Sequence, residues 1–361
     1  MVRPGDTIGV EEEFHVVRAD TGQPEPASRR LLRGTDAEPE LQRSMVETAS
    51  EVHTGLSALR EDLVARRRSL AEAGARIGLA VVAAGTVPEA GSRATRVYPN
   101  DRYEWMAEEY RQLVDEQQVC ACQVQVGLPD RDLAVRVTRR IRAWLPTLLA
   151  MSVSSPMFAG LDTGYASYRT VVTSRWPTVG PSPDINTAAE YQALIDDLVD
   201  SGVISDAGMV YFDARLSARY PTVEIRVADA CPIVDDAILI TALARGLVDT
   251  AVREDEAGAP VPESPQVLLR AATWRAARSG LMGHLLDPVA RSSVPAHERV
   301  HALLRHTREA LEARDDWDTA VQLWSALQAR GTSTDRQRHQ LQRGDEHKDL
   351  VATLIEETQQ A

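Results

Sequence analysis

The chain has 361 residues, of which 43% are hydrophobic and 26% charged, as in an ordinary globular protein with a substantial core. Its formal net charge of −13 argues against nucleic acids and anionic membrane surfaces as partners. We expect a cytoplasmic protein, because no apolar run approaches the roughly 18 residues of a membrane span, the N-terminus has no apolar signal-peptide core, and three cysteines, an odd number, do not suggest a disulfide framework.

Residues 7–17 are predicted to form a strand, since apolar side chains recur with a period of two at Ile8, Val10, Phe14 and Val16. Alternation then places Glu11, Glu13 and His15 on the opposite face. Carboxylates about 7 Å apart on one strand face repel each other. A magnesium or manganese ion would remove this conflict. The alternative is a solvated strand face with incidental acids.

The next segments mix strands and helices. A second acidic strand is expected over residues 44–52, with Glu47 and Glu51. Helical spacing follows over 56–80, a short apolar strand over 79–84 and a helix over 101–119.

Two later strands repeat the alternation of the first. In residues 120–127, Gln123 and Gln125 oppose the apolar side chains of Cys122, Val124 and Val126. In residues 221–227, Glu224 and Arg226 oppose those of Val223, Ile225 and Val227. Side by side in one sheet, the three strands would bury one face under helices and leave an acid-rich polar face for chemistry.

The rest of the chain is mainly helical. A helix is expected over 132–152, followed by a long segment over 154–187 that we interpret as an ordered loop near a site, because it is too aromatic for disorder. From about residue 234 to 361 we expect helices, interrupted at 258–265, near Pro288 and at Gly331. With no repeat or linker, residues 1–361 are predicted to be a single domain.

Seven stretches together resemble the carboxylate–amine ligases related to glutamate–cysteine ligase, the type-2 family. The resemblance begins with the Gly-Val-Glu-Glu-Glu-Phe signature at residues 9–14 and spans nearly the whole chain. The other stretches follow in the family's order at residues 44–47, 123–130, 162–169, 219–226, 274–281 and 331–338.

The resemblance implies an α+β, glutamine-synthetase-like catalytic domain: a curved antiparallel sheet, helices on its convex side and a helical C-terminal part. It also implies that ATP and Mg²⁺, or Mn²⁺, serve to join a small-molecule carboxylate, glutamate or another amino acid, to an amine through an acyl phosphate. A homodimer is suggested by the same analogy. Carried over by position, the metal ligands are Glu11, Glu13, Glu47, Gln123 and Glu224. The nucleotide contacts are Gln125, Arg169 and Arg226, while Glu224 and Arg226 are also assigned to catalysis.

The third strand departs from the family pattern, in which His-Val-His-Val-Gly is typical and where this chain has Gln123 and Gln125. An amide oxygen can ligate a hard metal and an amide can hydrogen-bond a phosphate, so catalysis is retained as the expectation. Two alternatives stay open: a non-catalytic relative that binds a nucleotide or amino acid, and a guanidino-type phosphotransferase.

Residues 297–301 fit the His-Glu-x-x-His pattern of zinc peptidases, with His297 and His301 as ligands. A zinc site also needs a third ligand and a sheltered environment. The neighbouring arginines indicate a solvent-facing helix, so a zinc hydrolase is a remote alternative.

Overall fold

The computed structural model describes residues 3–91 and 96–360. Its centre is a seven-stranded antiparallel sheet in the order β2-β3-β1-β5-β9-β8, with β4 also paired to β1. The strands are β1 (Ile8–Arg18), β2 (Glu38–Pro39), β3 (Met45–Ala49), β4 (Leu79–Val82), β5 (Ala121–Gly127), β8 (Ala214–Leu216) and β9 (Thr222–Asp229). Two small hairpins lie apart from it: β6 (Met157–Phe158) with β7 (Leu161–Asp162), and β10 (His284–Asp287) with β11 (Ser292–Pro295).

The helices before β9 are α1 (Ser28–Leu31), α2 (Leu56–Ala75), α3 (Asp101–Tyr110), α4 (Gln112–Asp115), α5 (Arg131–Ile141), α6 (Leu145–Ser152), α7 (Tyr168–Thr173) and α8 (Ala188–Asp200). Those after it are α9 (Val234–Glu256), α10 (Gln266–Ser279), α11 (Ala296–Glu312), α12 (Trp317–Arg330), α13 (Ser333–Gln342) and α14 (His347–Gln359). The expected helical C-terminal part is therefore present, with the β10–β11 hairpin inserted near Pro288.

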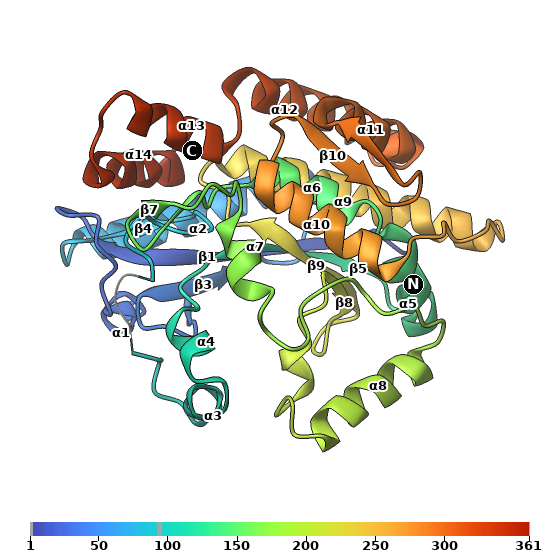
Figure 1. Cartoon of the computed structure of the whole chain (residues 1–361), viewed down its shortest axis with the longest axis horizontal. Helices are drawn as coiled ribbons and strands as arrows, with labels where there is room; N and C mark the ends of the chain where they lie inside the picture. Colours follow the sequence, from blue (N-terminus) through green and yellow to red (C-terminus); the bar gives the residue numbers. More distant parts are fainter. Residues whose placement is uncertain (1–2, 92–95, 361) are drawn as a thin grey trace.

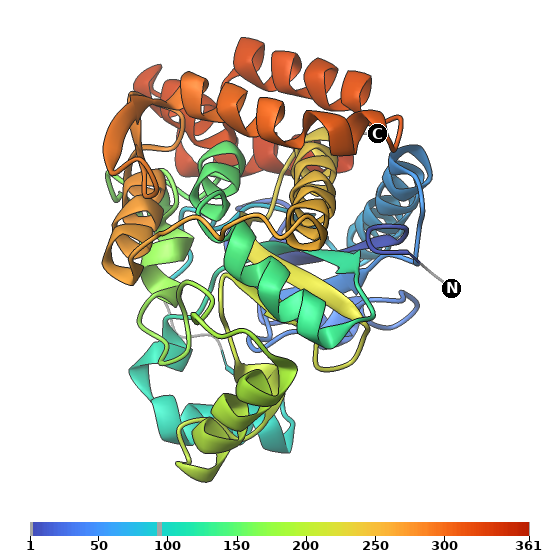
Figure 2. The same ribbon diagram turned by 90° about the vertical axis from the view of Figure 1, so that its right-hand side faces the viewer.

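The sheet separates two groups of helices. In Figure 1, α9, α11 and α12 lie above the sheet, while α3, α4 and α8 lie below it, and the turned view in Figure 2 shows the same order. The long helix α9 packs against β1 and β5 and is itself contacted by α2, α5, α6, α11 and α12. This arrangement follows from the composition of α9, whose residues are buried along most of its length.

The expected alternation is confirmed in the three long strands. Apolar side chains of β1, β5 and β9 all lie in the core, among them Val10, Val124 and Ile225. Glu12 shares this core-facing parity, and its buried carboxylate pairs with Arg67 of α2. The opposite face of the same strands therefore receives the polar side chains.

Two predicted helices are each divided. The helix expected over 101–119 ends at Tyr110, because Arg111 adopts a φ of +51°. The next helix, α4, starts at Gln112. The helix expected over 132–152 is split into α5 and α6, with Pro146 in the first turn of α6. The segment over 154–187 is ordered, and it also contains α7. No helix in the described ranges is long and apolar enough to cross a membrane.

Candidate active site

A cavity of about 1250 Å³ lies on the polar face of the sheet. Its floor is β1, β3, β5, β8 and β9, and its walls come from residues 36–41, α3, α7, α10 and the segment before β8. All eight residues predicted for the site line it: Glu11, Glu13, Glu47, Gln123, Gln125, Arg169, Glu224 and Arg226. The structure therefore brings together residues that are as much as 215 positions apart in the sequence (226 − 11).

Strand pairing explains this convergence. Glu13 of β1 lies directly opposite Glu47 of β3, and Glu11 lies opposite Gln123 of β5. On the other side of β5, Gln125 lies opposite Glu224 of β9. Directly paired residues have their side chains on the same face of a sheet, so carboxylates and amides form one continuous row across four strands.

The first half of the row is crowded with acids. Burial, and then the nearby Glu40, raise the pKa of Glu13 to about 8. Burial and the carboxylates of Glu40, Glu13 and Glu11 raise the pKa of Glu47 well above its usual range. Glu13 is 9% exposed and accepts hydrogen bonds from the backbone N–H of Ala121 and from Gln123, both at 2.7 Å. Glu13 and Glu47 lie opposite each other in their strand pair, and their mutual repulsion adds to the effect of burial on the pKa of Glu47.

The second half of the row is neutralised by arginines. Arg215 of β8 donates two hydrogen bonds of 3.0 Å to Glu224, and Arg226 contacts the same carboxylate. Burial alone would raise the pKa of Glu224, but Arg226 and Arg215 outweigh it and lower the pKa to about 2. This carboxylate, 2% exposed, is held in its ionised form.

The two glutamines of β5 bridge these halves. Gln123 donates to Glu13 and accepts from Arg226. Gln125 donates to Glu11 at 3.1 Å and accepts from the hydroxyl of Thr222. Their side chains thus face the cavity, as alternation predicts, and each amide uses both its donor and its acceptor.

Arg169 lines the cavity, but its guanidinium is occupied. Its Nε donates to Asp229 at 2.7 Å, and the same carboxylate accepts from the hydroxyls of Ser155 and Ser167. Asp229 is fully buried at the end of β9. The Arg169–Asp229 pair therefore fastens the N-terminal turn of α7 to the sheet.

The donor chemistry of the cavity fits a hard divalent cation. Magnesium and manganese prefer carboxylate and amide oxygens, and Glu11, Glu13, Glu47 and Gln123 offer both. The raised pKa values of Glu13 and Glu47 express a repulsion that such a cation would relieve. Across residues 3–91 and 96–360, no three acidic, histidine or cysteine side chains already converge as a preformed metal site.

The zinc pattern lies elsewhere, on α11. His297, Glu298 and His301 are all exposed, and His301 contacts the edge of the buried Trp324 ring. No third ligand joins the two histidines within the described part of the chain. These three side chains lie on an exposed helix face, whereas Arg299 between them is buried and pairs with Asp287, so the prediction that the neighbouring arginines face solvent is wrong for Arg299.

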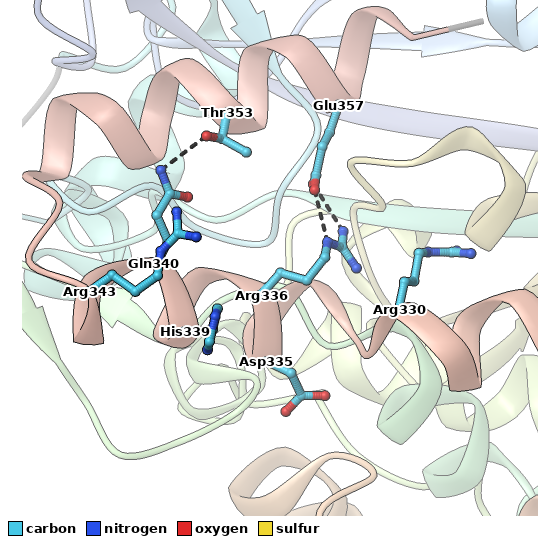
Figure 3. A pocket seen from close by; sticks show the side chains of 8 residues that line it. All are labelled: Arg330, Asp335, Arg336, His339, Gln340, Arg343, Thr353 and Glu357. Atoms are coloured by element: carbon cyan, nitrogen blue, oxygen red, sulfur yellow. Dashed lines mark hydrogen bonds and ion pairs between the residues drawn. The ribbon is translucent and has the colours of Figure 1, made fainter.

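A second, smaller cavity of about 540 Å³ lies between the last three helices, α12, α13 and α14. Figure 3 shows Arg336 directed at Glu357 of the facing helix and Gln340 directed at Thr353. The other members of the motif at 331–338 are also engaged: Gln337 donates to the carbonyl of Ser154, and Arg338 pairs with Asp162. This motif therefore connects the C-terminal helices to the segment that walls the main cavity.

Three charged residues close to the row, Asp213, Arg215 and Glu40, could not be predicted from the sequence pattern. Arg215 and Asp213 alternate with the buried Ala214 and Leu216, which is a strand signal, but β8 has only three residues. Glu40 lies beside Glu13 and Glu47 in an irregular segment without any periodicity.

Comparison with known proteins shows which family the chain belongs to. The sequence model of the family described as glutamate-cysteine ligase family 2 matches residues 7–355. The chain belongs to this family. A family relative from Mycolicibacterium smegmatis, provisionally named glutamate–cysteine ligase 2-2, is 46% identical over 357 residues, which cover 98% of this chain and 90% of the relative.

Other family members are longer. A relative from Frankia casuarinae, also provisionally named glutamate–cysteine ligase 2-2, is 47% identical over 354 residues. The match covers 97% of this chain but only 41% of that relative, as it does for another relative, from Frankia alni.

Solved structures share the fold of this family member at low sequence identity. Glutamate–cysteine ligase from Francisella tularensis, solved in complex with AMP, superposes with a TM-score of 0.70 at 11% identity, covering 99% of this chain and 89% of that one. A bifunctional glutathione synthetase from Pasteurella multocida gives a TM-score of 0.66 at 17% identity, covering 98% and 52%. At such low sequence identities, these similarities show a shared fold and do not show a shared activity.

Proposed function

We propose that this chain is an ATP-dependent carboxylate–amine ligase that activates its carboxylate substrate, glutamate or another amino acid, as an acyl phosphate. The observation that carries the proposal is the row of Glu13, Glu47, Glu11 and Glu224 beside Arg215 and Arg226 in one cavity. Phosphoryl transfer depends mainly on positioning and on neutralising the phosphate oxygens, which requires such a mixture of groups. Membership of the family and the AMP complex of the Francisella enzyme support a nucleotide in this cavity.

We assign the halves of the row to different tasks. Glu11, Glu13, Glu47 and Gln123 would hold Mg²⁺ or Mn²⁺, which, when bound, neutralises charge on the phosphate oxygens. Arg226, stacked 5.7 Å from the centre of the Tyr211 ring, would face the transferring phosphate, and Gln125 the nucleotide. Glu224 would keep Arg215 and Arg226 in place. We further propose that the sheet is curved with the site on its concave side, and that the chain is one cytoplasmic catalytic domain that forms a homodimer.

Measurement of ADP release with and without an added amine tests the proposal against its alternatives. With ATP, Mg²⁺ and a mixture of amino acids, we expect ADP, phosphate and a new amide, identified by mass spectrometry. A guanidino-type phosphotransferase would instead release ADP and a phosphorylated substrate without amide. Binding of ATP with no turnover in any mixture would favour the non-catalytic relative.

Substitution of Gln123 by His is expected to raise the preference for Mn²⁺ over Mg²⁺, because imidazole suits transition metals better than an amide oxygen does. Gln125→His is expected to change the apparent affinity for ATP more than that for the amine. Turnover against metal and ATP concentration measures both, with Gln192→His on the exposed face of α8 as a control. Identical dependences in all three variants and the native protein would remove both glutamines from the proposed site.

A further inference from the structure

Asp213 occupies a defined position on the cavity wall. Its backbone carbonyl accepts a hydrogen bond of 2.9 Å from the N–H of Arg226, and its own N–H donates to Gly180 at 2.7 Å. Because Ala214 pairs with Ile225 in the next register position, Asp213 lies opposite Arg226 at the start of β8. The neighbouring Ala214 is buried in the core, so alternation directs Asp213 into the cavity, whose lining includes it.

The carboxylate of Asp213 has no side-chain partner among the residues that the structure describes. Within residues 3–91 and 96–360 it makes no hydrogen bond and no ion pair with another side chain, whereas Glu13, Glu11 and Glu224 in the same cavity all do. Arg169 on α7 is the charged group that acts on it, while Arg226 on β9 and Arg215 on its own strand are its neighbours in the strand register. Arg169 is occupied by Asp229, and the other two by Glu224. Asp213 is half-buried and lines the cavity, so its carboxylate is accessible to a donor group of a bound ligand.

The proposed ligation needs such an acceptor. An amino-acid amine is a cation at neutral pH, and it cannot attack an acyl phosphate until it loses a proton. We propose that Asp213 binds the ammonium form of the amine substrate and takes one of its protons as general base. This inference rests on the proposed ligase function and adds a catalytic residue to it.

Three carboxylates of the row are less suited to this task. Glu224 is held ionised by two arginines, and its pKa of about 2 makes it a weak base. Glu11 and Glu13 are hydrogen-bonded to Gln125 and Gln123 and belong to the proposed metal set. By contrast, burial raises the pKa of Asp213 to about 7, with partial opposition from Arg169, so it is both unpartnered and matched to neutral pH.

One N–H bond of the ammonium group breaks, and its proton passes to an oxygen of Asp213. The freed lone pair of nitrogen attacks the acyl carbon, forming the C–N bond, and the C–O bond to phosphate breaks with its electron pair on the departing phosphate. The nitrogen loses its second proton to this phosphate, and Asp213 returns its proton to water after product release.

Hydroxylamine separates the proton transfer from the earlier activation, because it is mainly unprotonated at neutral pH and needs no base. The test compares native protein and Asp213→Asn with ATP, Mg²⁺ and a mixture of the standard amino acids, with or without hydroxylamine. For the variant we expect amide formation to fall by about 10²–10⁴-fold. Hydroxamate formation is expected to stay within about threefold of the native rate, since it bypasses the base. The residual amide rate of the variant is expected to rise about tenfold per pH unit with the fraction of free amine, while the native rate levels off above about pH 7.

Two further variants make the outcome decisive. Asp197→Asn, on the exposed face of α8, is expected to match the native protein in both assays. Asp213→Ser is expected to give the same split between amide and hydroxamate if Asp213→Asn folds poorly. Equal loss of both products, or loss of neither, overturns the role of Asp213. A native protein that forms neither product overturns the ligase function itself, and this inference with it.

Discussion

Replacement of Glu13 by Gln is expected to lower the ligation rate by about a thousandfold or more, which corresponds to about 4 kcal/mol of lost transition-state stabilisation. Glu13 lies at the centre of the acid row, opposite Glu47 and in contact with Gln123. Glutamine keeps the shape and one oxygen but removes the negative charge that a divalent cation requires. Steady-state ADP release measures the loss, with Glu108→Gln on the exposed face of α3 as a control.

The same substitution is expected to stabilise the metal-free protein. The pKa of Glu13 is raised to about 8 in the folded state, against about 4.3 in an unfolded chain. Below about pH 4, Glu13 is protonated in both the folded and the unfolded state, so its ionisation does not affect the free energy of unfolding. As the pH rises from about 4 towards 8, the carboxyl ionises more readily in the unfolded state, and the free energy of unfolding falls. Thermal unfolding in EDTA is expected to give Glu13→Gln a higher Tm than the native protein at pH 8 and a nearly equal Tm at pH 4. A lower Tm together with retained turnover would place Glu13 among structural residues.

The acid row could be predicted from sequence because it depends on a period of two. Once β1, β5 and β9 are identified as strands, alternation decides which side chains share a face, and Glu12 shows how strictly it applies. Glu12 stands between Glu11 and Glu13 in the sequence, yet it lies in the core with Arg67. The register of β1 predicted from its apolar residues is thus confirmed by burial.

Features that depend on strand order could not be predicted in this way. Arg215 reaches Glu224 only because β8 pairs with the free edge of β9, and a three-residue strand gives too short a pattern to reveal this. The consequence is large for Glu224. Alternation suggests another crowded acid whose removal relieves repulsion, but the structure gives it two arginine partners. Glu224→Gln would leave both cations short of a counter-charge, so this substitution, unlike Glu13→Gln, is not expected to stabilise the protein.

Disruption of the Glu12–Arg67 pair is expected to have the largest effect on stability. The two side chains are 1% and 2% exposed, and two hydrogen bonds of 2.5 and 3.0 Å join β1 to α2. Arg67 also donates to the carbonyls of Cys231 and Pro232, each at 2.7 Å, where β9 leads into α9. Arg67→Met would leave a buried carboxylate without its donors, and such losses cost about 3–5 kcal/mol. Urea unfolding at pH 7 measures this, and the exposed pair Arg308–Glu312 supplies a control, since Glu312→Gln is expected to cost less than about 1 kcal/mol.

The double variant Glu12→Leu/Arg67→Met separates charge from packing. When both charges are replaced by apolar side chains of similar volume, neither is left uncompensated, and such replacements of buried pairs are often neutral or stabilising. We therefore expect the double variant to recover most of the stability that Arg67→Met loses. Its ligation rate per folded molecule is expected to stay close to the native value, because Glu12 faces away from the cavity. A double variant as unstable as Arg67→Met would instead assign the loss to the hydrogen bonds that Arg67 makes with Cys231 and Pro232, which neither leucine nor methionine can replace.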